Sequence, residues 1–339
     1  MKHKIGIAGS ILLDVVKMID AWPDKGMLVN ILSVSRSVGG CVCNTATDLK
    51  ILDPDLSVSV FGKIGKDEYG KFLFQRMNVL KLNTSGLSFS PKINTSFTDV
   101  MTIRETGERT FFHSRGANSE FSVDDIDVEA LDCEIFHLGY LLLLDRLDEA
   151  DERYGTKAAK LLHDVQARGI KTSVDLVSEQ SERFAKVIVP ALKYCDYVII
   201  NEIEGARLSG ISFTDTKGKI SLNNLKKICE KIRSLGVRES VVIHCPRLSC
   251  SLDKNNRFTY VGSLELPDGY IVGAVGAGDA FCAGMLYAFL TAMPEETGMR
   301  LASCLAACNL AAADSVSGAR NLKETLDLEK KYPRRRVVC

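Results

Sequence analysis

Val275-Gly276-Ala277-Gly278-Asp279-Ala280-Phe281 is a glycine-rich turn followed by an acid and an apolar run with the character of a helix. Glycines permit a tight turn whose N–H groups point to one spot. The positive end of a helix dipole makes that spot suitable for a phosphate or a developing oxyanion. Asp279 beside it predicts a base that takes a proton from an alcohol attacking phosphorus. The alternative is an ordinary strand-to-helix turn in which Asp279 only caps the helix.

Short apolar runs alternate with helical patterns along the rest of the chain. The predicted strands are Lys4–Gly9, Ser57–Ile64, Glu134–Leu138, Lys171–Leu176, Tyr197–Asn201 and Val241–Cys245. The predicted helices are Asn44–Leu52, Asp67–Leu80, Tyr154–Arg168, Glu182–Tyr194, Leu222–Leu235, Gly276–Ala292, Met299–Val316 and Leu322–Lys331. This alternation predicts an α/β fold of three layers, with helices on both faces of a mainly parallel sheet.

Two pairs of strand-like segments have no helix between them. Leu12–Ile19 and Met27–Arg36 form one pair, and Phe97–Arg104 and Arg109–Ser114 form the other. Short glycine-containing connections favour hairpins. We predict a small β-sheet that stands off the main domain and acts as a lid, which would exclude water from a site. An extension of the main sheet is the alternative. The lid would comprise residues 12–36 and 96–116, and the main domain 1–11, 37–95 and 117–339.

Composition excludes several classes of partner. Lys plus Arg and Asp plus Glu both number 43, so bulk charge favours neither nucleic acid nor a membrane surface. Eleven cysteines occur without a Cys-x-x-Cys pair, which favours free thiols in a reducing compartment. No apolar run reaches the ~18 residues needed to span a bilayer. We expect a cytoplasmic protein that binds a small molecule.

A second polar constellation lies near the amino terminus. Gly39 and Gly40 precede Asn44 at the start of a predicted helix, and Asp14 ends an apolar stretch. Glycines let a hydroxylated ligand approach the backbone, and an amide can donate to and accept from a hydroxyl. These residues indicate a pocket for an acceptor molecule, although singly they also fit a loop and a helix cap.

Together these segments resemble the ribokinase-like (PfkB) carbohydrate kinases over nearly the whole chain. The matching pieces occur in family order: Gly9-Ser10 with Asp14; Gly39-Gly40 with Asn44; Gly62 to Gly70; Arg115-Gly116-Ala117-Asn118; Asn201-Glu202-Ile203-Glu204; and Gly276-Ala277-Gly278-Asp279. The resemblance implies the ribokinase-like fold and an ATP-dependent sugar kinase. A nucleoside kinase of the same fold is the alternative, and a non-catalytic sugar sensor is a third reading.

The resemblance also implies roles for individual residues. Asp279 would be the general base, and the amides of Gly276, Ala277 and Gly278 would form the anion hole. The acceptor would be held by Asp14, Gly39, Gly40 and Asn44, with Arg115 contacting the acceptor or a phosphate. Asn201 and Glu204, which share a helix face, would lie near the donor phosphates and hydrated Mg²⁺, with no side chain binding the metal directly. Two lids clasping each other would give a homodimer.

Two positions depart from the family pattern. Gly273 stands where the family usually has an Asp that helps to bind an activating monovalent cation. Dependence on such a cation therefore stays open, with backbone carbonyls near Val275 and Gly318 as the remaining ligands. The segment His244 to Ser249 lacks the usual Gly-x-x-Gly turn near the nucleotide, and Arg247 is a candidate to contact phosphate there instead.

Overall fold

The computed structural model describes residues 2–178 and 181–337. Its helices are α1 Cys41–Leu52, α2 Glu68–Val79, α3 Asp145–Asp148, α4 Lys157–Ala167, α5 Phe184–Leu192, α6 Glu202–Ser209, α7 Leu222–Ser234, α8 Ala277–Leu290, α9 Glu295–Leu310, α10 Leu322–Leu326 and α11 Leu328–Lys331. Its strands are β1 Lys4–Ala8, β2 Leu12–Ile19, β3 Ile31–Gly39, β4 Ser57–Gly65, β5 Asn83–Ser90, β6 Phe97–Ile103, β7 Arg109–Ser114, β8 Ile135–Leu141, β9 Ala150–Asp151, β10 Gly155–Thr156, β11 Lys171–Leu176, β12 Tyr197–Asn201, β13 Ser240–His244, β14 Leu248–Asp253 and β15 Phe258–Gly262.

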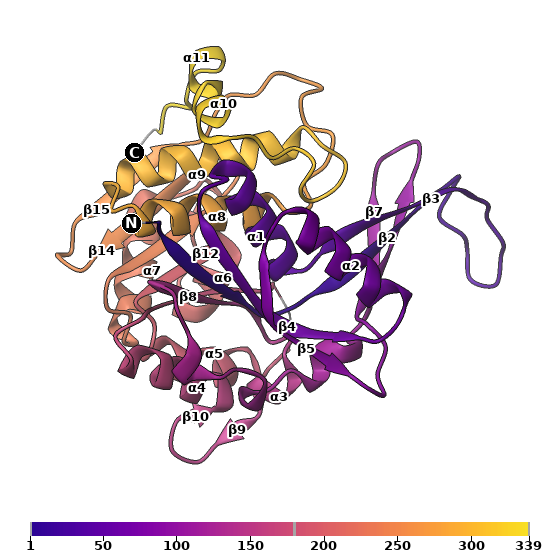
Figure 1. Ribbon diagram of the computed structural model, residues 1–339. Coiled ribbons are helices and arrows are strands. Elements are labelled where there is room, and N and C mark those ends of the chain that lie inside the picture. Colours follow the sequence, from indigo (N-terminus) through magenta and orange to yellow (C-terminus); the bar gives the residue numbers. More distant parts are fainter. Residues whose placement is uncertain (1, 179–180, 338–339) are drawn as a thin grey trace.

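A nine-stranded sheet forms the middle layer (Figure 1), in the order β15-β14-β13-β12-β11-β8-β1-β4-β5. The strands from β13 to β5 pair in parallel, and β14 and β15 add an antiparallel edge. Because the parallel strands point the same way, the residues that follow them gather at one edge of the sheet, where open α/β folds bind ligands.

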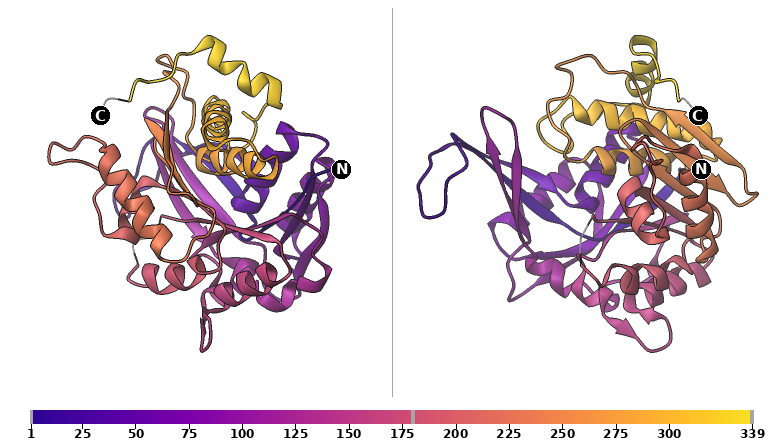
Figure 2. Two further views of the ribbon diagram at one scale, coloured as in Figure 1. Left: turned by 90° about the vertical axis from the view of Figure 1, so that its left-hand side faces the viewer. Right: turned by 180° about the vertical axis from the view of Figure 1, so that it is seen from behind.

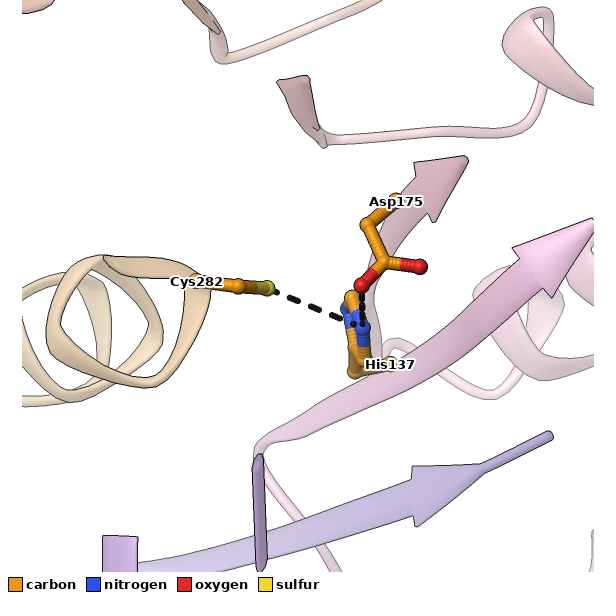
Figure 3. A group of neighbouring side chains, drawn as sticks. All are labelled: His137, Asp175 and Cys282. Carbon is orange, nitrogen blue, oxygen red and sulfur yellow. Dashed lines mark hydrogen bonds and ion pairs between the residues drawn. The ribbon is translucent and has the colours of Figure 1, made fainter. Parts of the chain in front are cut away.

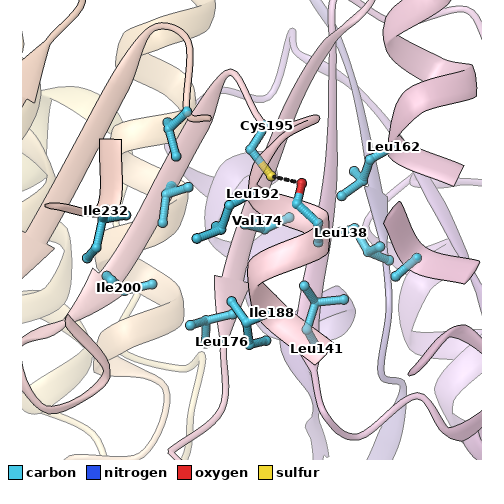
Figure 4. Packing of buried hydrophobic residues seen from close by; sticks show 14 of the residues in the cluster. Leu138, Leu141, Leu162, Val174, Leu176, Ile188, Leu192, Cys195, Ile200 and Ile232 are labelled. Atoms are coloured by element: carbon cyan, nitrogen blue, oxygen red, sulfur yellow. Dashed lines mark hydrogen bonds between the residues drawn. The ribbon is translucent and has the colours of Figure 1, made fainter. Parts of the chain in front are cut away.

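Helices cover both faces of this sheet. On one face, α4, α5 and α7 bury aliphatic residues against β8, β11 and β12; Leu162, Ile188 and Ile232 belong to this core (Figure 4). On the other face, α1, α2, α8 and α9 pack against the same sheet, with Leu49, Leu73, Leu286 and Leu305 fully buried. The predicted three-layer α/β/α fold is therefore confirmed, with the long apolar helix α8 in one outer layer.

A separate four-stranded sheet, in the order β3-β2-β6-β7, is called the small sheet below. The outer pairs β2–β3 and β6–β7 are antiparallel hairpins, whereas β2 and β6 run parallel where the hairpins join. Its far end projects from one side of the main body in both the front and the rear view (Figures 1 and 2). The strands predicted over Leu12–Ile19 and Arg109–Ser114 are confirmed.

Several element boundaries differ from the prediction. Met27 to Asn30 lie before β3 rather than within it, and residues 150–156 form the β9–β10 hairpin, so that α4 begins only at Lys157. Helix α9 begins after Pro294 and ends at Leu310, before the loop that carries Ser315. The strands β5 and β14 were missed because polar residues interrupt their sequences, and the five-residue strand β15 was missed as well. In β14, Ser249 and Ser251 are nevertheless buried. Among the described helices, none is long and apolar enough to cross a membrane.

Candidate active site

The glycine-rich turn lies at the start of α8. Gly276 is the N-cap of this helix with φ 78°, a left-handed conformation that favours glycine. A Cβ at this position would lie 2.4 Å from the carbonyl oxygen of Ser315, so the turn packs directly against the backbone of the loop after α9. The free amides of the first turn of α8 and the positive end of its dipole make this end of the helix suited to an anion.

Asp279 lies in the first turn of α8 and is 5% exposed. Its Oδ2 accepts hydrogen bonds from Asn44 Nδ2 at 2.8 Å and from the Tyr140 hydroxyl at 3.0 Å. Burial, followed by repulsion from Asp175, raises the pKa of Asp279 to about 7, although the two hydrogen bonds lower it. A carboxyl group with this pKa exchanges a proton readily at neutral pH, as a general base must.

Asn44 holds Asp279 from α1. Its Nδ2 donates to Asp279, and its Oδ1 accepts from the Ser315 hydroxyl at 2.8 Å. Both polar ends of the amide are thus bonded within the protein, and the residue is buried. Helix α1 begins directly after Gly40, which is its N-cap and has φ 84°. The backbone of Gly40 packs closely against Ser10, because a Cβ on Gly40 would lie 2.5 Å from the Ser10 carbonyl oxygen. Asn44 therefore orients the acid rather than presenting an open hydrogen-bonding pair.

Asp14 lies on β2 beside Gly39 of β3. A Cβ on Gly39 would lie 2.5 Å from Asp14 Oδ2, so only glycine leaves room for this carboxylate. Burial and repulsion from Asp279 raise the pKa of Asp14 to about 7, while Arg109 lowers it. The charge of Asp279 is thus one of those that act on Asp14. Asp14 keeps a partly exposed side chain, as a ligand-binding acid requires.

Asn201 and Glu204 form a reciprocal cap at the start of α6. Asn201 Oδ1 accepts from the Glu204 amide at 2.9 Å, and Glu204 Oε2 accepts from the Asn201 amide at 3.0 Å. Ser178 bridges them, accepting from Asn201 Nδ2 and donating to Glu204 Oε1, both at 2.9 Å. Burial raises the pKa of Glu204 to about 7. Both residues line a cavity of about 210 Å³ that Gly276, Gly278 and Asp279 also line.

A larger apolar cavity of about 560 Å³ adjoins the first. Gly278, Asn201 and His244 line both cavities, so the two meet at the start of α8. Aliphatic side chains from α9 and the loop before α8 line its walls, among them Ile271 and Leu310. The site thus combines a polar compartment beside the acid with an apolar compartment next to it. This combination suits a ligand that has one charged part and one flat, largely apolar part.

Arg115 is already paired within the protein. Its Nη1 donates to Asp145 Oδ1 at 2.7 Å and to the Leu142 carbonyl oxygen at 3.2 Å. It does not line the cavity of Asp279. Arg247 also lies elsewhere, in a surface cavity with Lys219 and Arg336. The structure therefore brings Asp279, Gly276, Gly278, Asn44, Asn201 and Glu204 together, while these two arginines lie outside that group.

Sequence reasoning missed four residues: Tyr140 and Asp175 near the carboxyl ends of β8 and β11, His137 within β8, and Cys282 on α8. Tyr140 donates its hydroxyl to Asp279, and Asp175 accepts from the Tyr140 amide at 2.7 Å. His137 Nε2 lies 3.5 Å from Asp175 Oδ2 and 3.7 Å from Cys282 Sγ (Figure 3). Asp175 is an acid at the carboxyl end of a parallel strand, which is the signal that could have identified it.

His244 is the last residue of β13. It packs on Phe281 with ring centroids 4.7 Å apart, yet it also lines both cavities. Burial lowers the pKa of His244 to about 4, so the imidazole is neutral at neutral pH. Its uncharged ring therefore forms part of the wall where the polar and the apolar cavity meet.

Comparison with known proteins agrees with this architecture. The profile of the pfkB family carbohydrate kinases matches residues 2–321. A probable fructokinase-7 of Arabidopsis thaliana is 25% identical over 292 residues, 84% of this chain and 80% of that protein. A nucleoside kinase of Methanocaldococcus jannaschii is 21% identical over 291 residues, 85% of this chain and 84% of that protein. Arabidopsis thaliana ribokinase, solved in complex with ribose and ATP, superposes with a TM-score of 0.79 at 18% identity and covers 97% of this chain and 99% of its own.

Proposed function

Because the chain belongs to the pfkB family of carbohydrate kinases, we propose that it transfers the γ-phosphate of ATP to a hydroxyl of a small carbohydrate. The observation that supports this most strongly is the position of Asp279. Its carboxyl group lies beside the amides that open α8, in a cavity with room for reacting groups. Asn44 and Tyr140 hold it in place. This is a base facing an anion hole, the arrangement that phosphoryl transfer to an alcohol needs.

In this proposal, Asp279 accepts the proton of the acceptor hydroxyl as the hydroxyl oxygen attacks the γ-phosphorus. The bond between that phosphorus and the bridging oxygen of ADP breaks at the opposite side, so the proton passes to Asp279 and the electron pair to ADP. The amides of Gly276, Ala277 and Gly278 stabilise charge on the transferring group. Positioning and electrostatic stabilisation are expected to supply most of the rate.

The apolar cavity beside Gly278 would receive the adenine and the polar compartment the phosphates. Asn201 and Glu204 fit a hydrated Mg²⁺ bound to those phosphates, because oxygen ligands and retained water are what this ion prefers. Both Glu204 oxygens already accept protein hydrogen bonds, which favours contact through water over direct binding. When bound, Mg²⁺ neutralises phosphate charge. The acceptor hydroxyls would lie against Asp14, Gly39 and Gly40, and a contact of Arg115 with substrate would require release from Asp145.

The acceptor class is tested by a screen. The purified protein is incubated with ATP, Mg²⁺ and single members of a panel of hexoses, pentoses and nucleosides, and ADP release and phosphorylated product are measured. A free sugar as the best acceptor, by kcat/KM, supports the proposal. A nucleoside as the best acceptor replaces it with the nucleoside kinase alternative. Ligand binding by calorimetry without any product would identify a sugar sensor.

The pH dependence of kcat/KM gives a sharper prediction. The pKa of Asp279 is about 7, raised first by burial and then by Asp175. Activity should therefore rise with pH as Asp279 loses its proton near pH 7. Asp175→Asn removes the repulsion but not the burial, so the midpoint should move to lower pH and stay above the ordinary carboxyl pKa.

The control for this measurement is Asp164→Asn, which changes an acid paired with Lys160 on α4. It should leave the midpoint where it is in the wild type. An unchanged midpoint in Asp175→Asn contradicts the assignment of Asp279 as the titrating base. So does a wild-type kcat/KM that does not fall as the pH is lowered well below 7.

We also propose that the small sheet acts as a lid and mediates a homodimer. Apolar side chains are exposed on it, including Ile31 at 51%, Val34 at 58% and Phe111 at 55%. Such a patch is typical of an interaction surface. The boundaries proposed for the lid remain residues 12–36 and 96–116.

Free thiols at ten described cysteines support a reducing, cytoplasmic location.

Val34→Lys should convert the dimer to a monomer, because it places a charge in the buried interface, and light scattering coupled to size-exclusion chromatography measures the mass. Val79→Lys is the matched control, since Val79 is 75% exposed at the end of α2 outside the small sheet. A wild-type protein of monomer mass, or a Val34→Lys protein of dimer mass, contradicts the interface.

A further inference from the structure

Three atoms converge on the point that a side chain at residue 273 would occupy. A Cβ on Gly273 would lie 2.7 Å from the Ala312 carbonyl oxygen, 3.2 Å from the Ala313 carbonyl oxygen and 3.1 Å from Nη2 of Arg109. Nη2 of Arg109 donates to the Ala313 carbonyl oxygen at 3.0 Å. A guanidinium from β7 of the small sheet thus occupies a space bounded by backbone carbonyls of the main domain, and it is the glycine that leaves it room.

The loop that carries these carbonyls supports the candidate anion hole. Ser315, two residues after Ala313, touches Gly276 through its carbonyl oxygen, and its hydroxyl donates to Asn44 Oδ1. Asn309 Nδ2 holds the same loop by donating to the Ser315 carbonyl oxygen at 2.9 Å and to Asp48 Oδ2 at 3.1 Å. Any displacement of residues 312–315 is therefore transmitted both to the turn at Gly276 and to the side chain that orients Asp279.

A monovalent cation does not fit this place while the Arg109 side chain occupies it. The carboxylate that the family pattern supplies is absent at Gly273, and the Arg109 guanidinium already donates to the Ala313 carbonyl oxygen beside it. We propose that the Arg109 side chain takes over the role of that cation, so that the enzyme needs no activating monovalent ion. Its charge is permanent, because a guanidinium does not lose its proton in proteins. It offsets the partial negative charge of the carbonyls that face it.

Arg109 is the first residue of β7, so the positive charge next to residues 312–315 belongs to the small sheet. Withdrawal of the small sheet would remove it, and return would restore it. Arg109 is a positioning residue in this account: it acts through residues 312–315 on the turn at Gly276. The inference rests on the proposed kinase function, since it concerns the same anion hole.

The experiment compares the wild type with Arg109→Ala, Arg109→Lys and Arg104→Ala. Arg104 is an exposed arginine across the same hairpin and serves as the control. Each protein is assayed with ATP, Mg²⁺ and the best acceptor from the screen, with tetramethylammonium, Na⁺ or K⁺ as the monovalent cation. The melting temperature is recorded in the same salts, which gives a readout that does not depend on catalysis.

Wild type and Arg104→Ala should have the same kcat/KM in all three salts. In tetramethylammonium, Arg109→Ala should lose roughly tenfold, a typical size for coupling between two sites. K⁺ or added guanidinium, which enter the vacated space, should restore most of the loss and raise the melting temperature of this variant alone. Arg109→Lys should stay close to the wild type, because it keeps a cation.

Strong K⁺ activation of the wild type would overturn the inference, as would an Arg109→Ala protein that is fully active in tetramethylammonium. A loss in Arg109→Ala that neither K⁺ nor guanidinium restores would show a merely structural role and would overturn it as well. Absence of product from every acceptor in every salt would instead refute the proposed function. The melting temperatures would then still decide whether Arg109→Ala gains a cation site that the wild type lacks.

Discussion

Asp279→Asn should bind ATP and fold like the wild type but lose turnover by ~10²- to 10⁴-fold, the usual loss when a general base is removed. The amide keeps the shape of the side chain, and its oxygen can still accept from Asn44 and Tyr140. It has no basic oxygen to take the proton from the acceptor hydroxyl. The loss should therefore fall on kcat, measured by coupled ADP release, while the ATP dissociation constant by calorimetry changes little.

Asp132→Asn is the control for this substitution. Asp132 is an exposed acid that pairs with Lys4 at the surface, so the same chemical change should leave kcat unaltered. A protein with Asp279→Asn that turns over at a rate near that of the wild type would remove Asp279 from the mechanism. Loss of ATP binding together with kcat would instead assign it a structural role.

Gly276→Ala should lose turnover by ~10²-fold, comparable to deleting one donor of an oxyanion hole. The added methyl group must fit at φ 78° and 2.4 Å from the Ser315 carbonyl oxygen, so the turn has to shift. A shift redirects the amides that face the transferring phosphate. The left-handed conformation alone costs an alanine roughly 1–2 kcal/mol in the free energy of unfolding, and the contact with Ser315 adds to that. Stopped assays and urea unfolding measure the two effects separately.

Gly269→Ala separates backbone strain from the anion hole. Gly269 has the same φ of 78°, and a Cβ there meets nothing within 4 Å. It should lower the free energy of unfolding by about 1 kcal/mol, the low end of the left-handed penalty, without changing kcat. Equal kcat values for Gly276→Ala and Gly269→Ala would mean that the turn at Gly276 has no special part in catalysis.

The ribokinase-like fold was predictable because its central strands are short apolar runs separated by periodic helices. The edges of the main sheet were not. In β14, Ser249 and Ser251 lie in a strand covered on both faces, so the strand lacks the apolar character that identifies β1 or β12. The start of α4 was misplaced because Tyr154 continues the helical pattern, although it belongs to the connection of a hairpin. Local patterns do not reveal such tertiary pairings.

The candidate site was predictable where glycines and acids stand close together in the sequence. Asp279 and Gly276 are three residues apart, so one segment indicates both. Tyr140 and Asp175 become neighbours only when β8 and β11 pair, and no local pattern distinguishes them. The contact of Arg109 with Ala313 joins residues 204 positions apart. It depends on how the small sheet meets the main domain, which the sequence does not encode locally.

Transfer of radioactive phosphate from [γ-³²P]ATP to the best acceptor, followed in wild type and Asp279→Asn at equal concentration, tests the central claim most directly. The account predicts labelled, singly phosphorylated acceptor from the wild type and almost none from the variant, although both bind ATP. Equal labelling by the two proteins, or label released only as inorganic phosphate by the wild type with every acceptor, would contradict it.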